Sequence, residues 1–161
     1  MRRRLLLGAA VTLPGCGFAL KRPPELSFRT IQLSGFAPRS PLAAELRTQL
    51  EASPTTRVVE SAAEAQVVVQ ALSEAREKVV VAQTAANQIR EFELRLRFSF
   101  RVRSAAGKDL IPDSEILLRR SLTYTESAAL AKEQEEAFLY RAMQSDIVSQ
   151  VLRRLTSVRL L

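Results

Sequence analysis

Apolar and polar residues alternate without interruption between positions 91 and 103. Every even position in this stretch is apolar: Phe92, Leu94, Leu96, Phe98, Phe100 and Val102. Every odd position is polar, and four of them are arginines: Arg95, Arg97, Arg101 and Arg103. Because successive side chains of a β-strand point to opposite faces, this pattern predicts one long strand with a buried face and a wet face. The fold must therefore cover one side of a sheet.

The remaining strands are predicted from β-branched clusters and turn residues. Residues 106–108 predict a tight turn, and residues 116–124 alternate again, so they predict an antiparallel neighbour of the long strand. Residues 27–36 predict a first strand. Residues 66–83 contain two valine clusters and predict either one long strand with an irregular middle or two short strands. Residues 56–60 could add a further short strand.

Two helices are predicted. Ser40 and Pro41 provide an N-cap and a proline at the first helical position, and leucines follow at four-residue spacing to a helix end near Ser53-Pro54. Thr125 is the expected cap of a long final helix that ends near Leu155. Its expected apolar face consists of Leu130, Phe138, Ala142, Val148, Val151, Leu152 and Leu155.

These elements predict an α+β fold in the order β-α-β-β-β-α, with two helices packed on one face of a mostly antiparallel sheet. The expected single domain covers residues 27–161.

Composition excludes many kinds of catalytic site. The chain has no histidine and one cysteine, which rules out Cys/His zinc sites, Ser-His-Asp triads, Cys-His dyads and an internal disulfide. Glycine is too scarce for a phosphate-binding loop. Paired carboxylates remain, although a solvated helix face explains them better. We therefore expect no catalytic residue, metal or cofactor; an enzyme would have to use Ser-Lys or carboxylate chemistry.

The N-terminus has the pattern of a lipoprotein signal. Three arginines at positions 2–4 precede an apolar stretch from Leu5 to Leu13, and Gly15 precedes Cys16. We expect residues 1–15 to be a cleaved signal peptide and residues 16–26 to be a lipidated N-terminus and tether, with the lipid on Cys16. The alternative is an ordinary secretory signal that leaves Cys16 as a free thiol.

Removing residues 1–15 takes away three arginines, so the net charge falls from +7 to +4. This modest charge weakens the case for a nucleic-acid partner.

The arginines on the wet face of the long strand are the first candidate site. Arg95, Arg97, Arg101 and Arg103 would form a stripe suited to phosphate or carboxylate groups, with Arg119 or Arg120 joining from the next strand. A solvated sheet face explains the same pattern. Lys132 is a second candidate: it is either a surface lysine paired with Glu136 or an exposed contact for an anionic ligand.

Three segments, in this order and spacing, resemble the LptE family of lipopolysaccharide-assembly lipoproteins: residues 16–21, residues 130–135 and residues 152–155. The resemblance implies a lipoprotein on the periplasmic side of the outer membrane, anchored in its inner leaflet. It also implies a 1:1 complex in which the domain plugs the LptD β-barrel and helps to place lipopolysaccharide at the cell surface, without covalent chemistry.

The resemblance also assigns roles to residues. A lysine implicated in lipopolysaccharide binding falls on Lys132. The family's loop arginine has no match, so either Arg90 or the nearby arginine stripe is the candidate substitute. The expected barrel contacts are Arg95, Arg97, Arg101, Arg103 and Arg119. The alternative is another periplasmic lipoprotein, either an accessory subunit of a lipid transporter or an activator of a cell-wall synthase.

Overall fold

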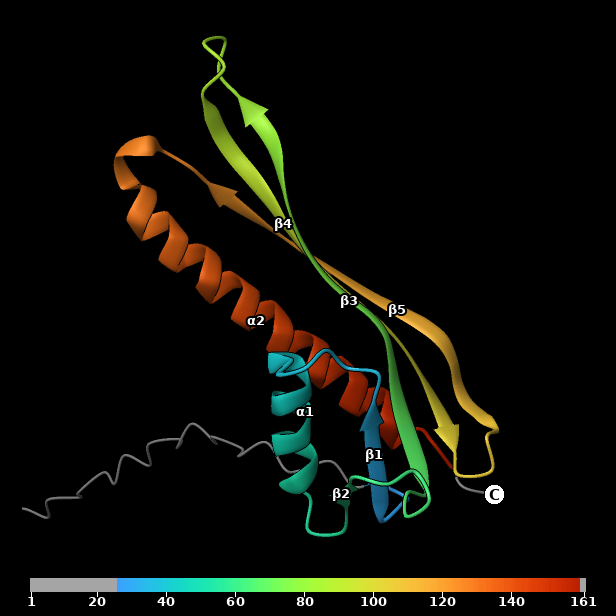
Figure 1. Ribbon diagram of the computed structural model, residues 1–161. Helices are drawn as coiled ribbons and strands as arrows, with labels where there is room; N and C mark the ends of the chain where they lie inside the picture. The colour runs from blue at the N-terminus through green and yellow to red at the C-terminus, as the bar shows by residue number, and fades with distance from the viewer. Residues whose placement is uncertain (1–25, 160–161) are drawn as a thin grey trace, which may run out of the picture.

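A five-stranded sheet forms the centre of the computed structural model, which describes residues 26–159 (Figure 1). The strands are β1 (Thr30–Ser34), β2 (Arg57–Val59), β3 (Val67–Gln83), β4 (Ile89–Ser104) and β5 (Asp109–Thr123), in the order β2-β1-β3-β4-β5. β3, β4 and β5 pair antiparallel over most of their length, whereas the short pairings of β1 with β2 and with β3 are parallel. The predicted α+β fold is confirmed, and the optional short strand is present as β2.

β4 is the predicted alternating strand. Its even positions from Leu94 to Val102 are buried, while the odd positions between them stay partly exposed. Phe98 stacks on Phe100 with ring centroids 5.3 Å apart. Phe92 is only partly buried, because the end of β4 that carries it extends beyond the main core.

β3 is one continuous strand with a β-bulge, which decides between the two predicted forms of residues 66–83. The register with β4 shifts between Ala71 and Ser73. Before the bulge the odd positions of β3 face the core, and after it the even positions from Glu74 to Val80 lie opposite the inward residues of β4. The bulge therefore turns Arg76 and Lys78 toward the helices.

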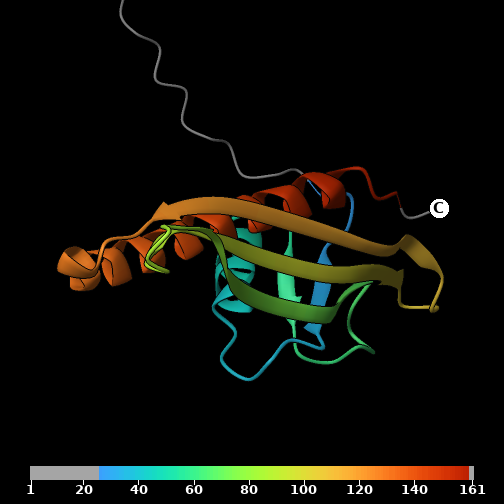
Figure 2. The ribbon, with the colours of Figure 1, turned by 90° about the horizontal axis from the view of Figure 1, so that it is seen from above.

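Two helices, α1 (Pro41–Glu51) and α2 (Ala129–Thr156), contribute buried residues to the same core cluster. Ser40 caps α1, because its hydroxyl accepts a hydrogen bond from the Ala43 amide at 3.2 Å. Thr125 does not cap α2; it precedes a short 3-10 helix, η1 (Glu126–Ala128), and its side chain makes no capping hydrogen bond. Figure 2 shows α2 running beside the long strands.

The expected apolar face of α2 is wrong at its N-terminal half. Leu130 and Phe138 are 72% and 62% exposed, and continuous burial begins near Tyr140. The reason is the position of α1, which packs only on the middle of α2, where Gln144 donates to the Pro41 carbonyl at 3.2 Å. The first half of α2 extends past α1, so α1 does not cover the side of it that faces away from the sheet (Figure 1).

Gly35 and Gly107 allow a matched test of how closely the residue after β1 packs on β3. Both have positive φ, at 74° and 80°, but a Cβ at Gly35 would overlap the Ala71 carbonyl oxygen, whereas a Cβ at Gly107 meets nothing within 4 Å. We expect Gly107→Ala to lower the free energy of unfolding by about 1 kcal/mol and Gly35→Ala to lower it by more than about 2 kcal/mol, measured by urea unfolding. Equal losses would contradict the close contact between Gly35 and β3.

Candidate functional site

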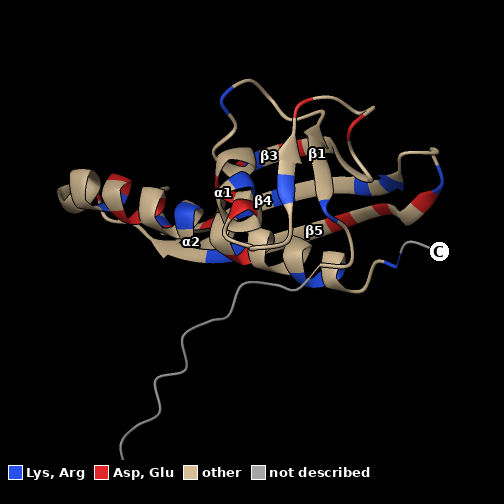
Figure 3. Cartoon of the chain, turned by 90° about the horizontal axis from the view of Figure 1, so that it is seen from below, with Lys and Arg blue, Asp and Glu red and all other residues tan. Residues whose placement is uncertain are grey.

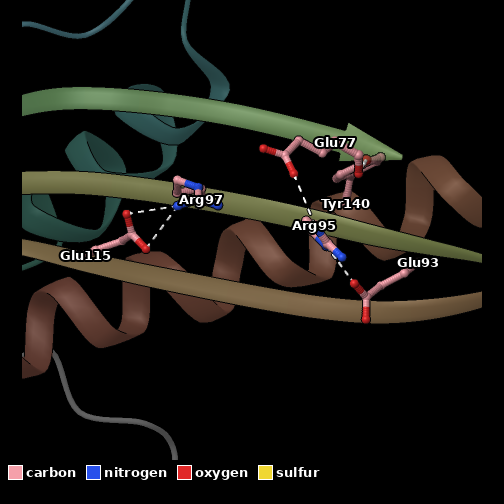
Figure 4. A network of polar contacts seen from close by, with 6 residues as sticks. All are labelled: Glu77, Glu93, Arg95, Arg97, Glu115 and Tyr140. Atoms are coloured by element: carbon pink, nitrogen blue, oxygen red, sulfur yellow. Dashed lines mark hydrogen bonds and ion pairs between the residues drawn. The ribbon is translucent and has the colours of Figure 1, made fainter. Parts of the chain in front are cut away.

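The outer face of β4 carries the predicted arginines, and its middle is shown in Figure 4. Arg95 Nε donates to Glu93 at 2.6 Å, and its guanidinium lies 3.7 Å from Glu77 of β3. Arg97 contacts the carboxylate of Glu115 of β5 at 3.3 Å. Each of these guanidinium groups is therefore neutralised by the chain's own sheet.

The same arrangement continues toward the other end of β4. Arg101 donates to the side-chain oxygen of Gln70 at 2.9 Å and lies 3.7 Å from Asp113. Arg103 pairs with Asp109 at 2.8 Å. The predicted arginine stripe is thus a row of cross-strand ion pairs, and its four arginine side chains are only 25–38% exposed.

Arg119 differs from the arginines of β4. It lies opposite Arg95 in the β4–β5 register, so both side chains occupy the outer face. Arg119 is exposed and forms no ion pair with a carboxylate in residues 26–159. It is therefore the cation of this face that is most available to a partner.

Lys132 lies where α2 meets the end of β5. Its ammonium group donates to the Thr123 hydroxyl at 3.0 Å and to the Glu135 carboxylate at 2.8 Å, and its side chain is 19% exposed. The expectations of an exposed lysine and of a pair with Glu136 are both wrong. Lys132 is on the side of α2 that faces the sheet, and Glu136 pairs with Lys78 at 2.5 Å.

Arg90 lies at the same end of the sheet as Lys132. Its side chain is exposed, and its carbonyl accepts a hydrogen bond from the Tyr124 amide at 2.8 Å. Arg90 also lines a hollow of about 200 Å³ together with Thr125 and the start of η1. The fold thus brings two cations 42 positions apart in the sequence to the two sides of the β5–α2 connection.

An open groove between β3 and α2 was not predicted. It has a volume of about 530 Å³ and is lined by Arg76, Lys78, Glu133, Glu136, Ala137 and Tyr140. The Arg76 guanidinium lies 5.2 Å from the centroid of the Tyr140 ring, and the Lys78 ammonium lies 4.3 Å from that of Phe92. The charged middle of β3 was the only sequence signal for this groove, and the bulge that turns it inward has no sequence signature.

Tyr140 of this groove has a shifted pKa. Burial raises the pKa of its phenol above the ordinary 10.0, the nearby Glu136 and Glu77 raise it further, and the Arg76 guanidinium opposes them. The hydroxyl donates to the Glu77 carbonyl at 2.7 Å, which links α2 directly to β3.

Other predicted features lie outside the described part of the chain or are tested by it only in part. Cys16, the signal peptide and the tether as far as residue 25 are outside residues 26–159. Within those residues no group of three or more acidic, histidine or cysteine side chains is arranged to hold a metal ion. No helix in the same range combines the length and the apolar character needed to cross a membrane.

The family model described as "LptE: Lipopolysaccharide-assembly" matches residues 28–155. The chain belongs to the LptE family. The match covers every strand and almost all of α2, so the resemblance predicted from short sequence segments is confirmed.

Solved structures of other lipoproteins are similar to this chain. The solution NMR structure of the uncharacterized lipoprotein B from Nitrosomonas europaea is 29% identical, with a TM-score of 0.75 over 88% of this chain and 91% of that one. Rare lipoprotein B from Shewanella oneidensis is 20% identical, with a TM-score of 0.69 over 80% and 95% of the two chains. A minor lipoprotein from Acinetobacter baumannii is also 20% identical, with a TM-score of 0.67 over 83% and 94%. The last two likenesses concern the fold alone.

Tyr140 gives a pH-dependent test of how this LptE-family domain joins α2 to β3. Because the pKa of Tyr140 is raised in the folded state, its protonated phenol contributes to stability. That contribution is fully present below pH 10 and is lost as the pH rises through the raised value. We expect Tyr140→Phe to lower the free energy of unfolding by about 1 kcal/mol at neutral pH, since the hydrogen bond to Glu77 is lost. Above pH 10 the free energy of unfolding of the Tyr140→Phe variant should also decline less than that of the unaltered protein.

Urea unfolding at several pH values measures both effects. Tyr124→Phe is the matched control, because it removes the other tyrosine of the chain and leaves the link to Glu77 intact. The same alkaline decline in the Tyr140→Phe variant and in the unaltered protein would contradict the assignment.

Proposed function

We propose that this protein is an outer-membrane lipoprotein, anchored through Cys16 in the inner leaflet, that plugs the LptD β-barrel as a 1:1 partner. It helps to place lipopolysaccharide at the cell surface and binds that lipid without catalysing a reaction. The observation that carries the proposal is the family match over residues 28–155.

The outer face of the sheet supports barrel contact. The lumen of a large β-barrel is polar and hydrated, so a plug needs a polar surface that does not bring unpaired charge into contact with the wall. The arginines of β4 satisfy this requirement, because their carboxylate partners come from neighbouring positions of the same sheet. A guanidinium that already holds a carboxylate is also a poorer phosphate ligand. This favours a protein partner for the face as a whole.

Arg90 and Lys132 support lipid contact at the other candidate site. Both are cations beside the β5–α2 connection, and the hollow at Arg90 is open to solvent. A phosphate that approached Lys132 would compete with Glu135 for the ammonium group. The proposal therefore requires an exchange of partners at Lys132, with the Thr123 hydroxyl remaining as a fixed neighbour.

Lys132 and Glu135 allow opposite changes at this site. We expect Lys132→Gln to weaken lipopolysaccharide binding by roughly tenfold, because one charge-assisted contact is lost. Glu135→Gln should strengthen binding, since it releases the same ammonium group from its ion pair. Binding of purified lipopolysaccharide to each variant is the measurement. Unchanged affinity in both variants would remove Lys132 from the site.

The outer face can be tested by reversing its charges. We expect Arg95→Glu combined with Arg97→Glu to reduce co-purification with LptD far more than it lowers the thermal stability of the isolated protein. Arg141→Glu is the matched control, because Arg141 is exposed on α2, away from the outer face. A complex that survives washing unaltered would show that the face meets only water. Recovery of a lipid transporter or a cell-wall synthase in place of LptD would support the alternative function.

A further inference from the structure

Three segments of the chain converge at the end of the domain opposite Arg90 and Lys132. The described chain begins here, where the Ser27 hydroxyl donates to the Val158 carbonyl at 2.6 Å. The C-terminal end of α2 and the turn between β4 and β5 are its neighbours (Figure 3, seen from below, with the C-terminus marked). Any tether that precedes Leu26 therefore leaves the domain from this end.

A cavity of about 370 Å³ opens between the β4–β5 turn and the C-terminal segment. Ala105, Ala106 and Leu110 form apolar walls, and Gln66 and Ser104 add polar groups. The exposed cations Lys108 and Arg159 also line it. The volume is within the range of small-ligand sites. The Arg159 guanidinium is held by the carbonyls of Thr156 and Val158, at 2.9 and 3.3 Å.

The cations around this cavity differ from the four arginines of β4, because they lack carboxylate partners. Within residues 26–159, Lys108 and Arg159 form no ion pair. Asp109, which follows Lys108 in the sequence, is already paired with Arg103 at 2.8 Å.

Arg29 and Arg57 extend the same unpaired positive charge. The Arg29 amide donates to the Gln66 side chain at 2.7 Å, and the Arg57 amide donates to the Arg29 carbonyl at 2.8 Å. The loop between β2 and β3 has two exposed carboxylates, Glu60 and Glu64, and Glu60 is already paired with Arg47 of α1 at 2.9 Å. The balance of charge at this end therefore remains positive.

We propose that this cavity binds the phosphate of a glycerophospholipid headgroup in the membrane leaflet that carries the anchor. The proposal rests on the proposed anchoring through Cys16. Residues 17–26 could span at most about 35 Å, so an anchored domain keeps this end close to the membrane surface. The ammonium and guanidinium groups would hold the phosphate, and the apolar walls would accept the glycerol and the upper acyl carbons.

The location separates this site from the proposed lipopolysaccharide contact. Lys132 and Leu155 lie 23 residues apart on α2, which corresponds to roughly 35 Å along the helix axis. One end of the domain would therefore face phospholipid while the other meets lipopolysaccharide. A lipid anchor combined with a basic patch also binds a membrane more firmly than either alone, and here the pair would fix the orientation of the domain.

The test uses the complete lipid-anchored protein, reconstituted in phosphatidylcholine vesicles with and without phosphatidylglycerol. Amide hydrogen exchange of residues 104–108 is measured in both. We expect exchange to be slowed by about tenfold when phosphatidylglycerol is present, and we expect Lys108→Glu combined with Arg159→Glu to abolish the slowing. Arg39→Glu combined with Arg141→Glu changes the charge equally at exposed positions elsewhere and should retain it.

Exchange within β4, from Leu94 to Val102, reports whether each variant is folded. Equal exchange rates in the two vesicle types would overturn the proposal, as would slowing that survives in the Lys108/Arg159 variant. Equal protection from inorganic phosphate alone, or stronger protection from lipopolysaccharide micelles, would overturn the assignment to a phospholipid headgroup. A protein that fails to remain on either vesicle would instead refute the anchor, and LptD co-purification tests the barrel partner separately.

Discussion

Burial of one face of β4 is the constraint on which the rest of the structure depends. Five even-numbered side chains from Leu94 to Val102 are almost fully removed from water, at roughly 1.5–3 kcal/mol for each large apolar side chain. Both helices contribute to the core that covers this face. The opposite face then has no layer over it, so the polar half of the alternation stays at the surface of the domain.

The chain neutralises that polar surface from within. Acidic residues of β3 and β5 lie beside the arginines of β4, so guanidinium groups close to one another on the strand do not form a bare cationic stripe. Within residues 26–159, cations without an ion pair include Arg119, Arg90 and those around the cavity between the β4–β5 turn and the C-terminal segment. The domain therefore has a compensated face and a basic end, which suit a polar protein wall and a phosphate-bearing surface respectively.

Sequence patterns succeeded where a periodicity alone decides which side is buried. The alternation of β4 and the leucine spacing of α1 were predicted because each strand or helix has one covered side. They failed on α2, where Leu130 and Phe138 have suitable spacing but no second layer above them. They also missed the groove at Arg76 and Lys78, since a single bulge reversed the inward and outward positions of β3.

The sequence by itself determined the α+β class, the long two-faced strand, the lack of any histidine-based site, and the membership in the LptE family. The class and the strand follow from local periodicity, the lack of histidine-based sites follows from composition, and the family follows from the match over residues 28–155. The tertiary structure alone decided which charges are compensated, that Lys132 is bound to Glu135 and Thr123, and that Lys108 and Arg159 share a cavity. Such contacts join residues distant in sequence, so they depend on register, bulges and helix placement that no local pattern encodes.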